Sequence, residues 1–156
     1  MTRGERWTMQ IATLLVAGTG SVYAVMRYLM RPVDEWAVVN HPWQPLVQHL
    51  HVLTAPLLVF ACGLIWHRHV VGRWRGGQPQ GRRSGPGLLA TLVPMVASGY
   101  LLQTTITASW RQVWVVVHVA TSLAWIAFFV AHQVRAWFAG GSGPGLEGGM
   151  PYRDER

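Results

Sequence analysis

Four long apolar stretches constrain the fold of this 156-residue chain most strongly. Each contains the roughly 20 residues that an α-helix needs to cross a hydrocarbon core about 30 Å thick. We therefore predict an all-α integral membrane protein, a four-helix bundle over residues 1–137 followed by a flexible tail at 138–156. The four predicted spans are residues 8–30, 45–66, 87–108 and 112–134.

The first apolar stretch has some features of a secretory signal peptide. Arg3 and Arg6 precede it, and the Val-Tyr-Ala sequence at 22–24 resembles a cleavage site. The apolar run is nevertheless too long for the core of a signal peptide. We expect it to be retained as the first transmembrane helix.

The positive charge of the chain indicates how it is oriented in the membrane. The net charge of +7 comes from 13 basic residues, all of them Arg, against six acids. The Arg lie between the apolar stretches rather than along one stripe, so we expect no nucleic-acid partner. Ten of them lie in the N-terminal tail, the loop between the second and third stretches, and the C-terminal tail. The positive-inside rule then predicts that both termini and this loop are cytoplasmic.

Composition excludes a disordered chain, since 51% of the residues are hydrophobic and only 12% are charged. Two segments differ from the rest: residues 72–87 are rich in Gly, Arg, Gln and Pro, and residues 140–149 are rich in Gly. We expect both to be flexible. The single cysteine, Cys62, has no partner for an intramolecular disulfide.

Histidines carry the chemical signal of this sequence. Of the seven, only His41 lies before the second apolar stretch, and we interpret it as structural. An ionisable side chain inside a membrane is costly, so a functional role is the default hypothesis for the others. These six lie within or at the ends of the second and fourth stretches: His49, His51, His67, His69, His118 and His132.

The histidines of the fourth stretch lie on one face at two depths. His118 and His132 are 14 residues apart, about 40° around an ideal helix and about 21 Å along it. The second and fourth helices run in the same direction, so each depth is matched by histidines of the second stretch. A six-coordinate haem iron takes one neutral imidazole on each side of the porphyrin. Two such pairs predict two bis-His haems b within the bundle.

The second stretch leaves alternatives open. His49 and His51 point about 200° apart, as do His67 and His69, so one of each pair can face the bundle. The 18 residues between His51 and His69 span about 27 Å, longer than the spacing in the fourth stretch. We favour His51 and His69, with His49 and His67 as alternates. Their face also carries small side chains that leave room for a macrocycle, namely Thr54, Ala55 and Cys62.

Other residues have weaker interpretations. Haem propionates need cations or water at the membrane boundary. Small residues at helical spacing, among them Gly20, Ser98 and Gly99, permit either close helix packing or close cofactor approach. Met95 is an alternative axial ligand. The candidate propionate contacts are Arg111 on the outer side and Arg68, Arg73 or Arg135 on the inner side.

Two other classes of protein compete with a cytochrome. A transition-metal-binding or transporting membrane protein would also use imidazole. A transport path is expected to carry intramembrane carboxylates, yet the only acids near a predicted span are Asp34 and Glu35, in the first outer loop. A cofactor-free membrane anchor subunit would leave the paired histidine depths unexplained.

The chain also resembles a known family. Three stretches carry the resemblance: QHLHVLTAPLLVFACGLIWHRHV at 48–70, MVASGYLLQ at 95–103 and WVVVHVATSLAWIAFFVAHQV at 114–134. They are similar to the four-helix di-haem cytochromes b that serve as membrane subunits of formate dehydrogenases and nickel-iron hydrogenases, and to their small stand-alone relatives. The likeness extends over about residues 8–137.

This resemblance implies bis-His haem b and electron transfer between a quinone pool and a redox partner. It implies a subunit of a larger oxidoreductase in the bacterial inner membrane, rather than a stand-alone enzyme. His118 and His132 match the family's two ligands on the fourth helix, and His51 matches the outer ligand on the second. The 16 or 18 residues from His51 to His67 or His69 depart from the family's usual spacing. The unligated histidines, His49 outside and His67 inside, are candidate proton acceptors for quinol.

Overall fold

The computed structural model describes residues 2–72, 76 and 84–141, and all of the regular structure in these residues is helical. Four helices are long and apolar enough to cross a membrane: Arg3–Leu29, Gln44–Val71, Ser84–Thr104 and Ala108–Phe138. This confirms the prediction of an all-helical chain with four membrane-length helices, while the placement of the termini stays a prediction. The chain divides into two compact units at residues 79 and 80.

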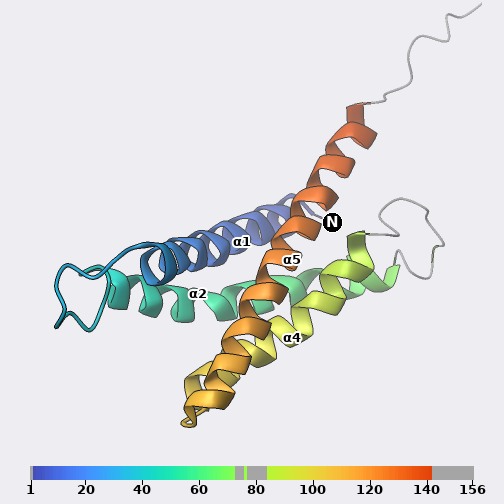
Figure 1. The fold of residues 1–156 in the computed structure, drawn as a ribbon. Helices are drawn as coiled ribbons and strands as arrows, with labels where there is room; N and C mark the ends of the chain where they lie inside the picture. Colours follow the sequence, from blue (N-terminus) through green and yellow to red (C-terminus); the bar gives the residue numbers. More distant parts are fainter. Residues whose placement is uncertain (1, 73–75, 77–83, 142–156) are drawn as a thin grey trace, which may run out of the picture. The chain divides into compact units, whose positions relative to one another are not determined.

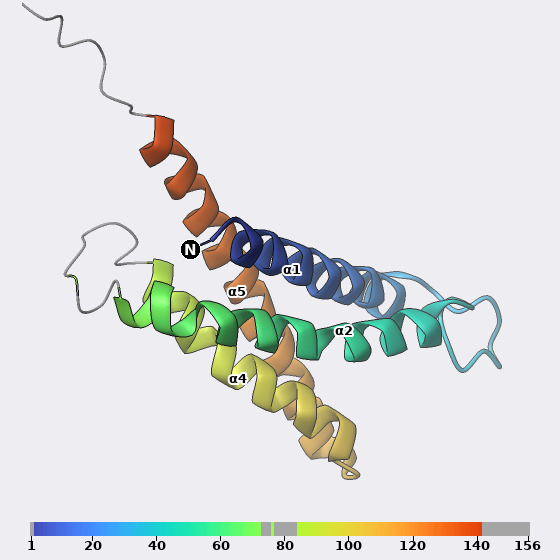
Figure 2. The ribbon, with the colours of Figure 1, turned by 180° about the vertical axis from the view of Figure 1, so that it is seen from behind.

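The first unit is a pair of antiparallel helices. α1 spans Arg3–Ala24 and continues as a short π-helix, η1, at Val25–Leu29. α2 spans Gln44–Ile65 and continues as a second π-helix, η2, at Trp66–Val71. Figures 1 and 2 show α1 and α2 side by side along most of their length, joined by the loop at the end of η1.

Local sequence explains where these two helices begin. At the start of α1 the Thr2 hydroxyl accepts from the Glu5 N–H at 3.2 Å, and the Glu5 carboxylate accepts from the Thr2 N–H at 2.7 Å. This reciprocal capping box satisfies backbone donors that a helix start leaves unpaired. Pro45 lies in the first turn of α2, where a missing N–H costs nothing.

The second unit is also an antiparallel pair. α4 spans Ser84–Thr104, and α5 spans Ala108–Gly141 after a connection of three residues (Figures 1 and 2). The helices approach closely where a Cβ on Gly87 would lie 2.9 Å from the ring of Phe128. The 34 residues of α5 are about 51 Å long, more than a hydrocarbon core requires.

Two segments predicted to be flexible fall partly within these helices. Ser84 to Gly87 form the first turn of α4, and residues 138–141 end α5. The remainder of those segments, at 73–75, 77–83 and 142–156, lies outside the described residues. The candidate propionate contact Arg73 lies there too.

Candidate functional site

His51, on α2, is held against α1 by its Nδ1 atom. That nitrogen lies 3.1 Å from the carbonyl oxygen of Val16 and 3.3 Å from the hydroxyl oxygen of Thr19. Because a carbonyl oxygen can only accept, Nδ1 is the protonated nitrogen and donates to Val16. In a neutral imidazole the basic lone pair is then on Nε2, the nitrogen that a metal ion would coordinate.

Gly20 lets this imidazole approach the α1 backbone. A Cβ at Gly20 would lie 2.8 Å from Cε1 of His51, closer than real Cβ contacts allow. The sequence is compatible with a role for Gly20 in either helix packing or cofactor approach. In the structure the His51 ring of the neighbouring helix occupies the space beside Gly20 where a side chain would lie.

His118, on α5, has the corresponding environment in the second unit. Its Nδ1 lies 3.0 Å from the carbonyl oxygen of Met95 and 3.3 Å from the hydroxyl oxygen of Ser98, both on α4. A Cβ at Gly99 would lie 3.2 Å from Cε1 of the same ring. Met95, considered above as an axial ligand through its thioether, thus contacts the histidine through its backbone carbonyl.

The two environments share one local pattern. Counting from the residue that supplies the carbonyl, the hydroxyl follows three residues later and the glycine four residues later. We call this arrangement the imidazole cradle. Its members are Val16, Thr19 and Gly20 on α1, and Met95, Ser98 and Gly99 on α4.

His132 has a simpler environment further along α5. Its Nδ1 lies 3.0 Å from the hydroxyl oxygen of Ser84, the first residue of α4. Ser84 is buried and His132 is half-buried, so this contact is partly shielded from solvent. A hydroxyl can donate or accept, so this contact is compatible with either neutral tautomer of His132.

Within each candidate pair on α2 and η2, the two histidines differ in how much of their surface is exposed. His49 and His67 are exposed, whereas His51 and His69 are half-buried. His67 and His69 lie in the π-helix η2. A π-helix has hydrogen bonds between residues i and i+5 and more residues per turn than an α-helix, so successive residues are separated by a smaller angle around its axis. The same-face argument for His51 and His69 assumed α-helical geometry throughout, so it does not hold across η2.

His41, interpreted from the sequence as structural, accepts a hydrogen bond from the Trp43 N–H at 3.2 Å. Its own carbonyl accepts from the Gln44 N–H at 3.0 Å. Both contacts are local to the turn that precedes α2.

Of the arginine candidates, Arg68 lies in η2, Arg111 in the first turn of α5, and Arg135 six residues before the end of α5. Arg68, Arg111 and Arg135 are exposed. Arg68 Nη1 lies 4.0 Å from Glu5 Oε1, and Glu5 has only 17% of its side chain exposed. The prediction that Asp34 and Glu35 are the only acids near a span is wrong. α1 begins at Arg3, because the capping box starts the helix before the apolar run, and Glu5 therefore lies within it.

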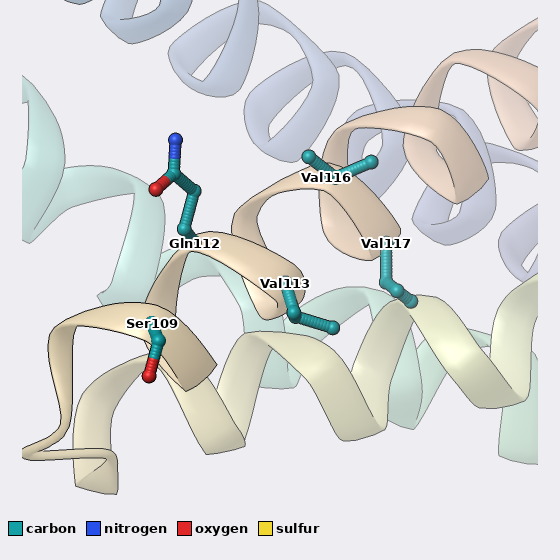
Figure 3. A pocket seen from close by; sticks show the side chains of 5 residues that line it. All are labelled: Ser109, Gln112, Val113, Val116 and Val117. Atoms are coloured by element: carbon teal, nitrogen blue, oxygen red, sulfur yellow. The ribbon is translucent and has the colours of Figure 1, made fainter.

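Two shallow hollows lie on the helix surfaces, and the second adjoins the contact between Thr19 and His51. Figure 3 shows the first, where Ser109, Gln112, Val113, Val116 and Val117 follow one another along α5. None of its lining residues is ionisable. The second lies between α1 and α2, and Thr19 is its only polar side chain; the others are Leu14, Leu15, Gly18, Val22, Val47 and Leu50. Among residues 2–72, 76 and 84–141, no three His, Cys, Asp or Glu side chains cluster as a metal ion would require.

No family model, curated protein or solved structure matches this chain.

Proposed function

We propose that this chain is a membrane-bound cytochrome b that carries electrons through bis-His haem b groups. One observation supports the proposal above all: Nδ1 of His51 and of His118 is fixed on a helix carbonyl. Metal-ligating histidines characteristically donate their second ring N–H to such an acceptor, which orients the ring and selects the tautomer.

The donor set also fits haem rather than a hard cation. Neutral imidazole is an axial ligand of haem iron, and a low-spin haem needs two of them. We assign His51 and His118 to one haem, on the sequence-based expectation that the second and fourth spans cross the membrane in the same direction and carry these histidines at one depth. On the same expectation His132 would pair with His69 at the other depth, with His67 as the alternate. His49 is the alternate to His51.

Haem, when bound, supplies reversible one-electron exchange. The residues of the chain hold the imidazoles in one orientation and surround them with apolar helix. Arg111, in the first turn of α5, and Arg135, six residues before the end of α5, are exposed and could meet propionates. The guanidinium of Arg68 also lies 4.0 Å from the Glu5 carboxylate, so a propionate bound by Arg68 would share this guanidinium with Glu5.

The cellular role follows from the resemblance to di-haem cytochromes b. We place the chain in the bacterial inner membrane, with both termini cytoplasmic, as one subunit of a larger redox complex. Electrons would pass between a quinone pool and a protein partner. His49 and His67 are exposed and are therefore suited to accept protons from quinol.

Single alanine variants on α2 test the ligand assignment. His51→Ala should lose the low-spin spectrum of one haem, as should His118→Ala, because each removes an axial nitrogen. His49→Ala is the matched control, two residues away and exposed, and should keep the full spectrum. The measurement is haem content and the reduced-minus-oxidised visible spectrum of detergent-purified protein. Haem loss in His49→Ala but not in His51→Ala would exchange the two roles, and unchanged spectra in all three would reject the proposal.

A further inference from the structure

Each imidazole cradle contains one hydroxyl group, that of Thr19 or that of Ser98. The inference about these two hydroxyls rests on the proposed function. We propose that Thr19 and Ser98 are positioning residues that fix the rotation of the His51 and His118 rings and lower the reduction potential of the haem they ligate. Neither residue touches the iron. Each would act through the Nδ1–H of a histidine.

The geometry provides two acceptors for one N–H. In each cradle the carbonyl oxygen lies 3.0 or 3.1 Å from Nδ1, and the hydroxyl oxygen lies 3.3 Å away. A single carbonyl would leave the ring some freedom to swing about that one contact. A second acceptor one helical turn further on, with glycine backbone beneath Cε1, restricts the ring to one rotation.

Each hydroxyl is itself fixed as an acceptor. Thr19 Oγ1 lies 2.6 Å from the carbonyl oxygen of Leu15, and Ser98 Oγ lies 2.6 Å from that of Pro94. A hydroxyl has one proton, and these contacts direct it to the hydroxyl's own helix. Its lone pairs then face the imidazole N–H.

The electronic consequence follows from ligand basicity. Accepting from Nδ1–H gives the ring more imidazolate character, and a more basic ligand stabilises the oxidised iron. Hydrogen bonding around the ligands is one of the ways in which a protein tunes a haem potential. Loss of either hydroxyl should therefore raise the potential of the haem held by His51 and His118.

The test uses the full-length protein with Thr19→Val and Ser98→Ala. We expect both variants to keep their haem, to raise the midpoint potential of one haem, and to shift or broaden the low-spin electron paramagnetic resonance signal of the same haem. The conservative variants Thr19→Ser and Ser98→Thr should restore the wild-type potential and signal, since each retains a hydroxyl.

Thr91→Val is the matched control. Its hydroxyl donates to the carbonyl oxygen of Gly87, four residues back in the same helix, as Ser98 does to Pro94. This control should leave the potential unchanged. An unchanged potential and signal in both Thr19→Val and Ser98→Ala would overturn the positioning role while leaving the cytochrome assignment intact. Absence of haem from the folded wild-type protein would instead reject the proposed function itself.

Discussion

At the scale of single residues, close contact between a histidine ring and a glycine determines the geometry of each cradle. Gly20 and Gly99 lie four residues after the carbonyl that fixes the ring. A Cβ at Gly20 would overlap the imidazole of His51, whereas one at Gly99 would require the His118 ring to shift by a few tenths of an ångström. Glycine costs about 1 kcal/mol of helix stability relative to alanine, and at these two positions it permits the close approach of a histidine ring.

Gly20→Ala should therefore destabilise the protein. Its new Cβ would lie 2.8 Å from Cε1 of His51, so the ring or the helix must move, at a cost of about 1–3 kcal/mol. The control is Gly18→Ala on the same helix, where an added Cβ would meet nothing within 4 Å. The higher helix propensity of alanine should increase the free energy of unfolding of this variant, by at most about 1 kcal/mol. Thermal unfolding in detergent measures both. Equal stability of the two variants would show that the ring does not depend on Gly20.

The candidate ligand residues could be predicted from the sequence, whereas the contacts that orient their rings could not. Apolar surroundings distinguish His51 and His118 as candidate ligands, and small residues at helical spacing single out Gly20 and Gly99. The roles of Thr19 and the Met95 carbonyl depend on how far one helix slides along its neighbour. That register arises from tertiary packing, which local residue patterns do not reveal.

At the scale of elements, α2 continues as the π-helix η2, which contains His67 and His69. Length and apolarity predicted four helices, because a membrane span requires both. The π-helix η2 has no Gly or Pro within Trp66–Val71 to signal it. π-helical turns occur frequently at functional sites, and this one changes the angle between His67 and His69 from the value expected for an α-helix.

Replacement of the two η2 histidines tests this consequence. His69→Ala should lose the bis-His spectrum of one haem, because His69 is half-buried, whereas His67→Ala should retain it, because His67 is exposed. Optical and electron paramagnetic resonance spectra of the purified variants distinguish low-spin from high-spin iron. The opposite result would make His67 the ligand. Retention of two low-spin haems in both variants would place the fourth ligand elsewhere.

At the scale of the whole molecule, the described residues form two helix pairs with extensive apolar surface. Leu14, Leu53 and Val93 each have more than 70% of their surface exposed. Exposed apolar side chains on membrane-length helices are consistent with contact with lipid. Composition and span length predicted this class of protein. The proposed binding of a quinone and of a partner protein would depend on surfaces that have no distinctive pattern in the sequence.

The haem content of the purified full-length protein tests the central claim most directly. The pyridine haemochrome method counts haem per chain, and a reduced-minus-oxidised spectrum reports its spin state and ligation. We expect two low-spin haems b per chain, one for each histidine depth. One haem per chain would contradict the assignment of a second site to His132 and His69. A folded protein without haem would contradict the account as a whole.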